Sequence, residues 1–116
     1  MSALTFNYIQ LDYLETMTDG DSDMMQTMLD MLIAEIPEEI EKMNAALTIQ
    51  DWQELFQISH KMKTTLSFIG NEQMIHTNKT LEHNARHETD LGTIPGFVKE
   101  LTELSVMVVE ELQMVK

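Results

Sequence analysis

Residues 51–70 read DWQELFQISHKMKTTLSFIG, and this stretch decides the fold. Apolar residues recur in it at steps of three and four, which is the spacing of one face of an α-helix. They are Leu55, Ile58, Met62, Leu66 and Ile69. Asp51 followed by Glu54 has the spacing of an N-terminal capping box, and Gly70 is a natural C-terminal cap. The stretch therefore predicts an amphipathic helix over residues 51–69.

The same periodicity continues on both sides of this helix. It predicts a short helix over residues 9–17 and longer ones over 21–47, 71–87 and 94–115. Pro37 suits the first turn of a helix, so we expect a kink or a fresh helix start there. Short connections between long helices imply antiparallel neighbours. We expect one all-α domain over residues 1–116, an antiparallel four-helix bundle with the short N-terminal helix packed against it.

Composition narrows the classes of function. The 116 residues carry a formal charge of −13, from 20 Asp and Glu against 7 Lys and Arg. Such a surface repels phosphate backbones and anionic lipids, so we expect neither nucleic acid nor a membrane as a partner. The absence of cysteine excludes disulfides and zinc–thiolate sites. No secretory signal or transmembrane stretch is recognisable, so a cytoplasmic location is expected. We also expect a monomer. The start at Met1 favours a freestanding protein over a fragment of a longer chain.

His60 stands out because it lies opposite the apolar face of the helix over residues 51–69, so it is predicted to point to solvent. This exposed face of the helix carries no carboxylate, although the chain is strongly acidic. Lys63 follows one turn beyond the imidazole. The other residues on or beside this face are Gln53, Phe56, Gln57, Thr64, Ser67 and Phe68.

These residue types suit phosphoryl transfer. A neutral imidazole such as that of His60 is a nucleophile near neutral pH, because its unperturbed pKa is about 6.5. Phosphoryl transfer needs positioning and charge stabilisation rather than covalent chemistry from the protein. Lys63 can reach phosphoryl oxygens, Lys61 adds positive potential from the flank, and Thr64 and Ser67 offer hydroxyl donors. Taken alone, Lys63 would be interpreted as an ordinary solvated lysine. Its placement beside an exposed histidine favours a phosphoryl-transfer site.

The segment His60–Gly70, HKMKTTLSFIG, resembles the signature of histidine-containing phosphotransfer (HPt) domains. That signature is a histidine, any residue, an aliphatic residue, lysine and glycine, with a second glycine further on. His60, Met62, Lys63 and Gly70 occupy matching positions. The resemblance covers nearly the whole chain, because three further segments are also typical of the family: Leu14–Asp21, Ile36–Glu38 and Asp51–Trp52.

The resemblance implies a function. His60 is expected to accept a phosphoryl group from a receiver-domain aspartate of a hybrid sensor kinase and to pass it to a response-regulator aspartate. Lys63 would stabilise the phosphate. The receivers would supply Mg²⁺, so no cofactor is expected in this chain, and the missing glycine-rich phosphate loop agrees with a carrier that has no kinase activity. The expected docking surface comprises Gln53, Phe56, Gln57, Lys61, Thr64, Ser67 and Phe68. Phe56 and Phe68 would anchor the receiver through their rings, although Phe56 could equally lie at the edge of the core.

Thr64 departs from the family pattern, which has glycine or another very small residue directly after the lysine. The small residue lets a partner approach the imidazole closely. A threonine there implies slower docking or a narrower choice of partners. It also leaves open a second hypothesis, in which the chain is a scaffold or inhibitor that binds receivers without being phosphorylated.

A third hypothesis is a metal-binding bundle. His83 and His87 are spaced i, i+4, and His76 lies two turns before His83, so all three could share one helix face. Glu72 and Glu82 are not far off. Helical histidine pairs without a buried carboxylate pair are mostly surface residues, so this hypothesis ranks below the carrier.

Overall fold

The computed structural model describes residues 6–116, and all of its regular structure is helical. The α-helices in this part of the chain are α1 (Asp12–Thr18), α2 (Ser22–Thr48), α3 (Trp52–Ile69), α4 (Glu72–His87) and α5 (Ile94–Val115). A single 3-10 turn, η1 (Leu91–Thr93), leads into α5. The prediction of an all-α fold is confirmed.

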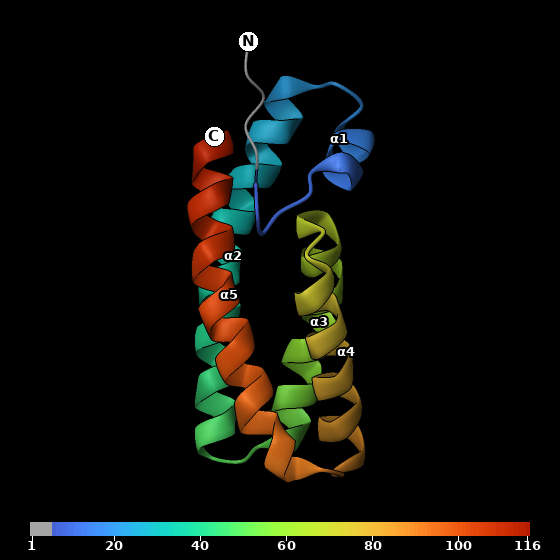
Figure 1. Ribbon diagram of the computed structural model, residues 1–116, viewed down its shortest axis with the longest axis vertical. Helices are drawn as coiled ribbons and strands as arrows, with labels where there is room; N and C mark the ends of the chain where they lie inside the picture. Colours follow the sequence, from blue (N-terminus) through green and yellow to red (C-terminus); the bar gives the residue numbers. More distant parts are fainter. Residues whose placement is uncertain (1–5) are drawn as a thin grey trace.

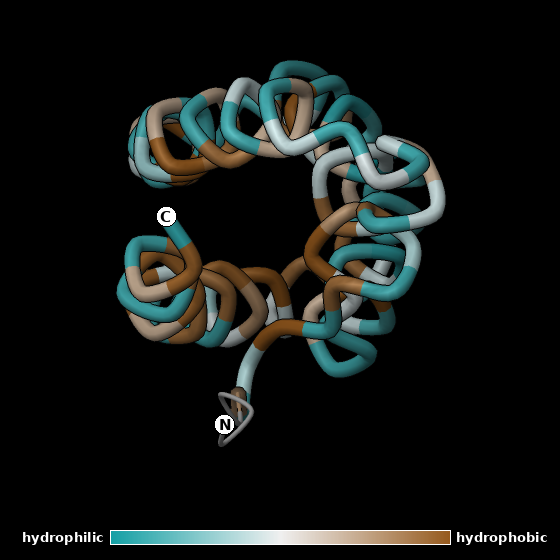
Figure 2. Tube along the Cα trace, turned by 90° about the horizontal axis from the view of Figure 1, so that it is seen from above, coloured by the Kyte–Doolittle hydropathy of each residue, from teal (hydrophilic) through white to brown (hydrophobic). Residues whose placement is uncertain are grey.

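The four long helices form the expected antiparallel bundle (Figure 1). Each of α2 to α5 packs against the next along the chain, and α5 closes the ring by packing against α2. The short α1 lies at the end where α3 stops and contacts both α2 and α3. Viewed from above, hydrophobic segments turn mostly toward the common centre (Figure 2). The result is an elongated molecule of 48 × 22 × 19 Å.

Side-chain caps start three of the helices. The carboxylates of Asp21 and Asp51 and the amide oxygen of Asn71 each accept the backbone N–H three residues later, at 2.9, 3.1 and 2.9 Å. Gly70 ends α3 in the left-handed conformation, with φ of 72°. A Cβ at Gly70 would lie 2.6 Å from the carbonyl oxygen of Gln10. Glycine is therefore required here both by the backbone angle and by the close approach.

The periodicity predicted that the first helix begins at Ile9, but it begins at Asp12. Residues 7–10 form an N-terminal strap instead. The buried carboxylate of Glu111, on α5, accepts the backbone N–H groups of residues 7, 8 and 9 at 2.9, 2.8 and 3.2 Å. The N–H of residue 10 donates to the carbonyl of Ile69 at 2.8 Å. These bonds tie residues 7–10 to α5 and to the end of α3.

Pro37 does not start a new helix, so that alternative in the sequence prediction is wrong. It lies exposed inside a continuous α2 of 27 residues. Proline removes one backbone donor from a helix interior and crowds the preceding turn. Its neighbours Ile36 and Ile40 are buried in the core on either side, and this burial holds the helix together through the proline.

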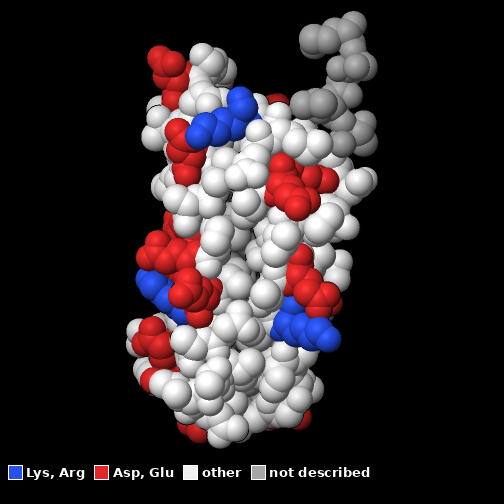
Figure 3. All heavy atoms as spheres, turned by 90° about the vertical axis from the view of Figure 1, so that its left-hand side faces the viewer, with Lys and Arg blue, Asp and Glu red and all other residues white. Residues whose placement is uncertain are grey.

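Acidic side chains predominate over basic ones on the side of the molecule formed by α2 and α5 (Figure 3). Several of the basic groups are already paired there. Lys42 lies 3.5 Å from both Glu38 and Glu39, and Lys116 pairs with Asp30. Among residues 6–116, no helix is long and apolar enough to span a bilayer.

Candidate functional site

His60 points to solvent from the middle of α3, with 65% of its side chain exposed. The five residues of the predicted apolar face of this helix are all buried. Opposite faces of one amphipathic helix thus hold the core and the imidazole, as the periodicity predicted. The rigid bundle fixes the backbone from which His60 projects.

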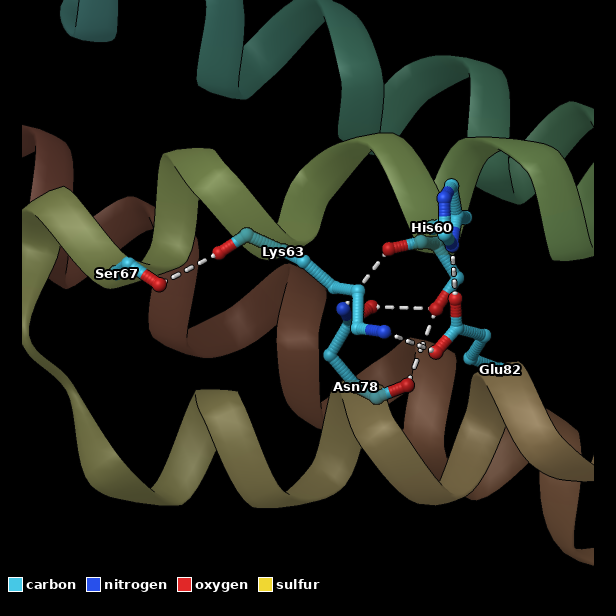
Figure 4. Close-up of polar contacts among 6 residues, drawn as sticks. His60, Lys63, Ser67, Asn78 and Glu82 are labelled. Atoms are coloured by element: carbon cyan, nitrogen blue, oxygen red, sulfur yellow. Dashed lines mark hydrogen bonds and ion pairs between the residues drawn. The ribbon is translucent and has the colours of Figure 1, made fainter.

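A carboxylate from the neighbouring helix meets this imidazole. Glu82, on α4, lies with Oε2 at 2.6 Å from Nδ1 of His60 and with Oε1 at 3.2 Å from Nζ of Lys63 (Figure 4). Only 12% of the Glu82 side chain is exposed. The expectation of a surface without carboxylates is correct for α3 alone and wrong for the folded protein. A single-helix projection cannot include what α4 contributes.

The position of Glu82 can nevertheless be read from the hairpin that α3 and α4 form. The chain reverses at Asn71, and His60 and Glu82 each lie eleven residues from it. In two antiparallel helices with equal rise per residue, such positions are at the same height. This spacing is the signal that pairs the two residues, whereas Glu82 had been considered only as a metal ligand.

The electrostatics of Glu82 define the state of the imidazole. Burial raises the pKa of Glu82, but hydrogen bonds from His60 and Lys63, together with the Lys63 charge, outweigh it and hold the pKa below its ordinary value of 4.5. The carboxylate is therefore ionised at neutral pH and can only accept hydrogen bonds. Nδ1 of His60 must then be the donor. Whenever the ring is neutral, its lone pair is therefore on Nε2.

The two phenylalanines of the expected docking surface are partly buried and pack against the core. The ring of Phe56 lies 5.8 Å from that of His60, and the guanidinium of Arg86 lies 5.7 Å from the Phe56 ring centroid. Phe68 stacks on Tyr13 of α1 at 5.6 Å. The alternative in which Phe56 lies at the edge of the core is therefore confirmed, and neighbouring helices leave only part of each ring available to a partner.

The remaining predicted site residues divide into two groups. Nζ of Lys61 bonds to the buried carboxylate of Glu39 on α2 at 3.1 Å, so its charge is already paired. The hydroxyl of Ser67 donates to the backbone carbonyl of Lys63 at 2.9 Å. Three residues of α3 are simply exposed around His60: Gln53, Gln57 and Thr64.

The histidines of the metal-binding hypothesis all lie exposed on α4. The rings of His83 and His87 are 4.6 Å apart. Glu82, a proposed companion, is engaged with α3 instead. Within residues 6–116, the fold assembles no group of three potential His, Cys, Asp or Glu ligands. A histidine pair is the most that this face offers a cation.

A comparison with known protein families identifies the family to which a bundle with an exposed histidine of this kind belongs. The sequence matches the Hpt domain family over residues 27–112. The chain belongs to the Hpt domain family. Hpt domains carry phosphoryl groups on histidine in phosphorelays and have receiver domains as partners; they are carriers and not kinases. No curated protein matches the chain significantly.

Two solved structures have the same fold as this Hpt domain. Histidine-containing phosphotransfer protein B (HptB) from Pseudomonas aeruginosa PAO1 superposes with a TM-score of 0.84 at 21% identity, over 95% of each chain. The HPT domain of a sensor hybrid histidine kinase from Shewanella superposes with a TM-score of 0.78, also at 21% identity, over 92% of each chain. The similarity includes the short N-terminal helix packed on a four-helix bundle.

Proposed function

We propose that His60 is the phosphoryl-accepting residue of this Hpt domain. It takes the group from a receiver-domain aspartate of a hybrid sensor kinase and passes it to the aspartate of a response-regulator receiver. The observation that carries this proposal is the pairing of an exposed imidazole with the ionised Glu82, which holds the proton on Nδ1 and leaves Nε2 free.

The first half-reaction uses that lone pair. Nε2 of His60 attacks the phosphorus of an aspartyl phosphate, a new N–P bond forms, and the P–O bond to the aspartate breaks. The aspartate leaves as a carboxylate with the bonding electrons. The phosphorylated ring then carries a positive charge, and the proton on Nδ1 stays hydrogen-bonded to Glu82. A charge-assisted bond of this kind is about twice as strong as a neutral one.

The second half-reaction returns the electrons to Nε2. The carboxylate of the response regulator attacks phosphorus, the N–P bond breaks, and the ring leaves as neutral imidazole because Nδ1 has kept its proton. Without that proton the leaving group would be an imidazolate anion, which is far more basic. Glu82 therefore supports transfer in both directions without net uptake or release of protons.

Lys63 supplies positive charge to the phosphoryl oxygens in this scheme. Its side chain is 53% exposed, and its Nζ lies 3.2 Å from Oε1 of Glu82. Because the lysine stem is flexible, Nζ can turn from the carboxylate to a phosphoryl group bound at Nε2. The shared contact with Glu82 keeps the ammonium beside the imidazole between transfers.

Receiver docking is proposed on the exposed side of α3, over Gln53, Phe56, Gln57, Lys61, Thr64, Ser67 and Phe68. A groove of about 140 Å³ beside Lys63 extends this surface between α3 and α4, with Leu66 and Ile75 among its lining residues. It offers apolar contact beside Lys63, which lies one turn along α3 from His60. We also propose that the domain, residues 1–116, acts as a cytoplasmic monomer, since a net charge of −13 opposes self-association.

The test is transfer of labelled phosphate. Receiver domains charged with a small phosphate donor are mixed with the purified chain, and acid-labile label on it is measured. We expect label on the wild type and none on His60→Gln, which stays folded because His60 faces solvent. His83→Gln is the matched control, an exposed histidine on α4 that should change nothing.

Two results would contradict the assignment. Acid-labile label that persists on His60→Gln would place the phosphoryl group on another residue. If a phosphorylated receiver bound the wild type and no label moved, the chain would be a scaffold that only binds receivers.

A further inference from the structure

A buried polar pair joins α3 and α4 directly beneath the proposed site. Ser59 and Asn78 are 0% and 2% exposed. The Ser59 hydroxyl lies 2.7 Å from the side-chain oxygen of Asn78 and 3.0 Å from its backbone oxygen, and it can donate to either. In return, Nδ2 of Asn78 donates to the backbone oxygen of Ser59 at 2.9 Å. We call this reciprocal arrangement the Ser59–Asn78 clasp (Figure 4).

The clasp binds the two helical turns that carry the site. In an α-helix each carbonyl accepts the N–H four residues later. The carbonyl of Ser59 is therefore the acceptor for the N–H of Lys63, and the carbonyl of Asn78 for the N–H of Glu82. Ser59 also directly precedes His60. Every cross-helix bond of the clasp thus ends within one turn of a residue that forms the site.

The remainder of the α3–α4 contact has no comparable constraint. In the described part of the chain, side-chain hydrogen bonds and ion pairs between these helices are confined to the clasp and to Glu82 with His60 and Lys63. Apolar side chains tolerate small shifts between helices, whereas a buried hydrogen bond forms at one register only. Leaving buried polar groups unpaired is costly, so the clasp disfavours every other register.

We infer that Ser59 and Asn78 are positioning residues, which set the register of α3 against α4 so that Glu82 meets Nδ1 of His60. This role rests on the proposed function of His60. A catalytic constellation must be held to about 0.5 Å, and in the described part of the chain the 2.6 Å contact between Glu82 and His60 is supported from α3 only by the exposed, flexible Lys63 and by the buried clasp. Both residues act through Glu82 and touch no phosphoryl group.

The test replaces both partners at once. In Ser59→Ala with Asn78→Leu, neither helix keeps an unpaired buried side-chain group, so the bundle should stay folded. NMR of the imidazole ring nitrogens reports which nitrogen of His60 carries the proton. We expect the share of the Nδ1–H tautomer to fall and label transfer from a charged receiver to slow by about 10-fold or more, since an error of 1 Å can cost about 100-fold.

Ile58→Ala is the matched control. Ile58 is buried on α3 next to Ser59 but is apolar, so this change lowers stability without removing a clasp bond. Its His60 tautomer should match the wild type. If the folded double variant kept the wild-type tautomer, the inference would be overturned, whatever happened to the transfer rate. If the double variant did not fold, Ser59→Ala alone would decide the matter by the same measurement.

Failure of the clasp and failure of the proposed function give different results. The tautomer is measured without any receiver, so it tests the clasp even if His60 never accepted label. Conversely, if removing the clasp did not change the tautomer, label transfer to His60 of the wild type would still be observed.

Discussion

Replacing Glu111 by alanine should release the N-terminal strap and destabilise the bundle. The carboxylate accepts three backbone N–H groups, which differ in their access to water. Residue 7 is exposed, so water can replace its bond, while Tyr8 is partly buried and Ile9 is 4% exposed. With about 2 kcal/mol for the amide of Ile9 and about 1 kcal/mol for that of Tyr8, we expect a loss of about 3 kcal/mol.

The assay is thermal unfolding followed by circular dichroism. With an unfolding entropy of about 2.1 cal/mol/K per residue over 116 residues, the loss corresponds to a Tm lower by about 12 °C. Glu110→Ala is the matched control, because Glu110 is its exposed neighbour on α5 and should shift Tm little. Glu111→Gln keeps one acceptor oxygen and should fall in between. A Tm for Glu111→Ala within about 4 °C of the wild type, or fast hydrogen exchange of the Ile9 amide in the wild type, would refute the reasoning.

Two further predictions concern Gly70 and Glu82. Gly70→Ala should lower the free energy of unfolding, measured with denaturant, by about 2 kcal/mol or more. Gly20→Ala is the control, also at positive φ but with open space around it, and should lower it by about 1 kcal/mol. Equal losses would mean that the contact with Gln10 is unimportant. Lys63→Met should raise the pKa of Glu82 in an NMR titration, because it removes a hydrogen-bond donor and a charge that lower this pKa. Since the folded pKa is depressed, the stability from this pairing is present above pH 4.5 and is lost as the pH falls through the folded pKa. An unchanged pKa in the variant would show that Lys63 does not act on this carboxylate.

Much of the site follows from the sequence because it depends on one helix. The 3.6-residue period sets the direction of each side chain around the axis, so the buried face and the exposed His60 could be placed without knowing any other element. Caps at Asp51 and Gly70 are equally local, since their bonds reach only a few residues along the chain. The family signature adds the chemistry of the exposed histidine.

Side-chain environments could not be predicted in the same way. Phe56 and Phe68 lie on the exposed side of α3, yet Arg86 of α4 and Tyr13 of α1 cover part of their rings. Lys61 is close to His60 in sequence, but it pairs with a buried carboxylate on α2. Each of these contacts joins two elements, and a helical projection contains only one.

The amino-acid sequence by itself determined the helices, the all-α bundle and the exposed histidine, because periodicity and capping act within a few residues. Only the tertiary structure showed that Glu82 meets Nδ1 of His60 and that Glu111 binds the N-terminal strap. Both are carboxylates whose partners lie on other segments, nineteen or more residues away in the chain. Their contacts depend on how distant segments are placed against one another, and that placement follows from bonds between elements, such as the buried hydrogen bonds of Asn78 between α3 and α4.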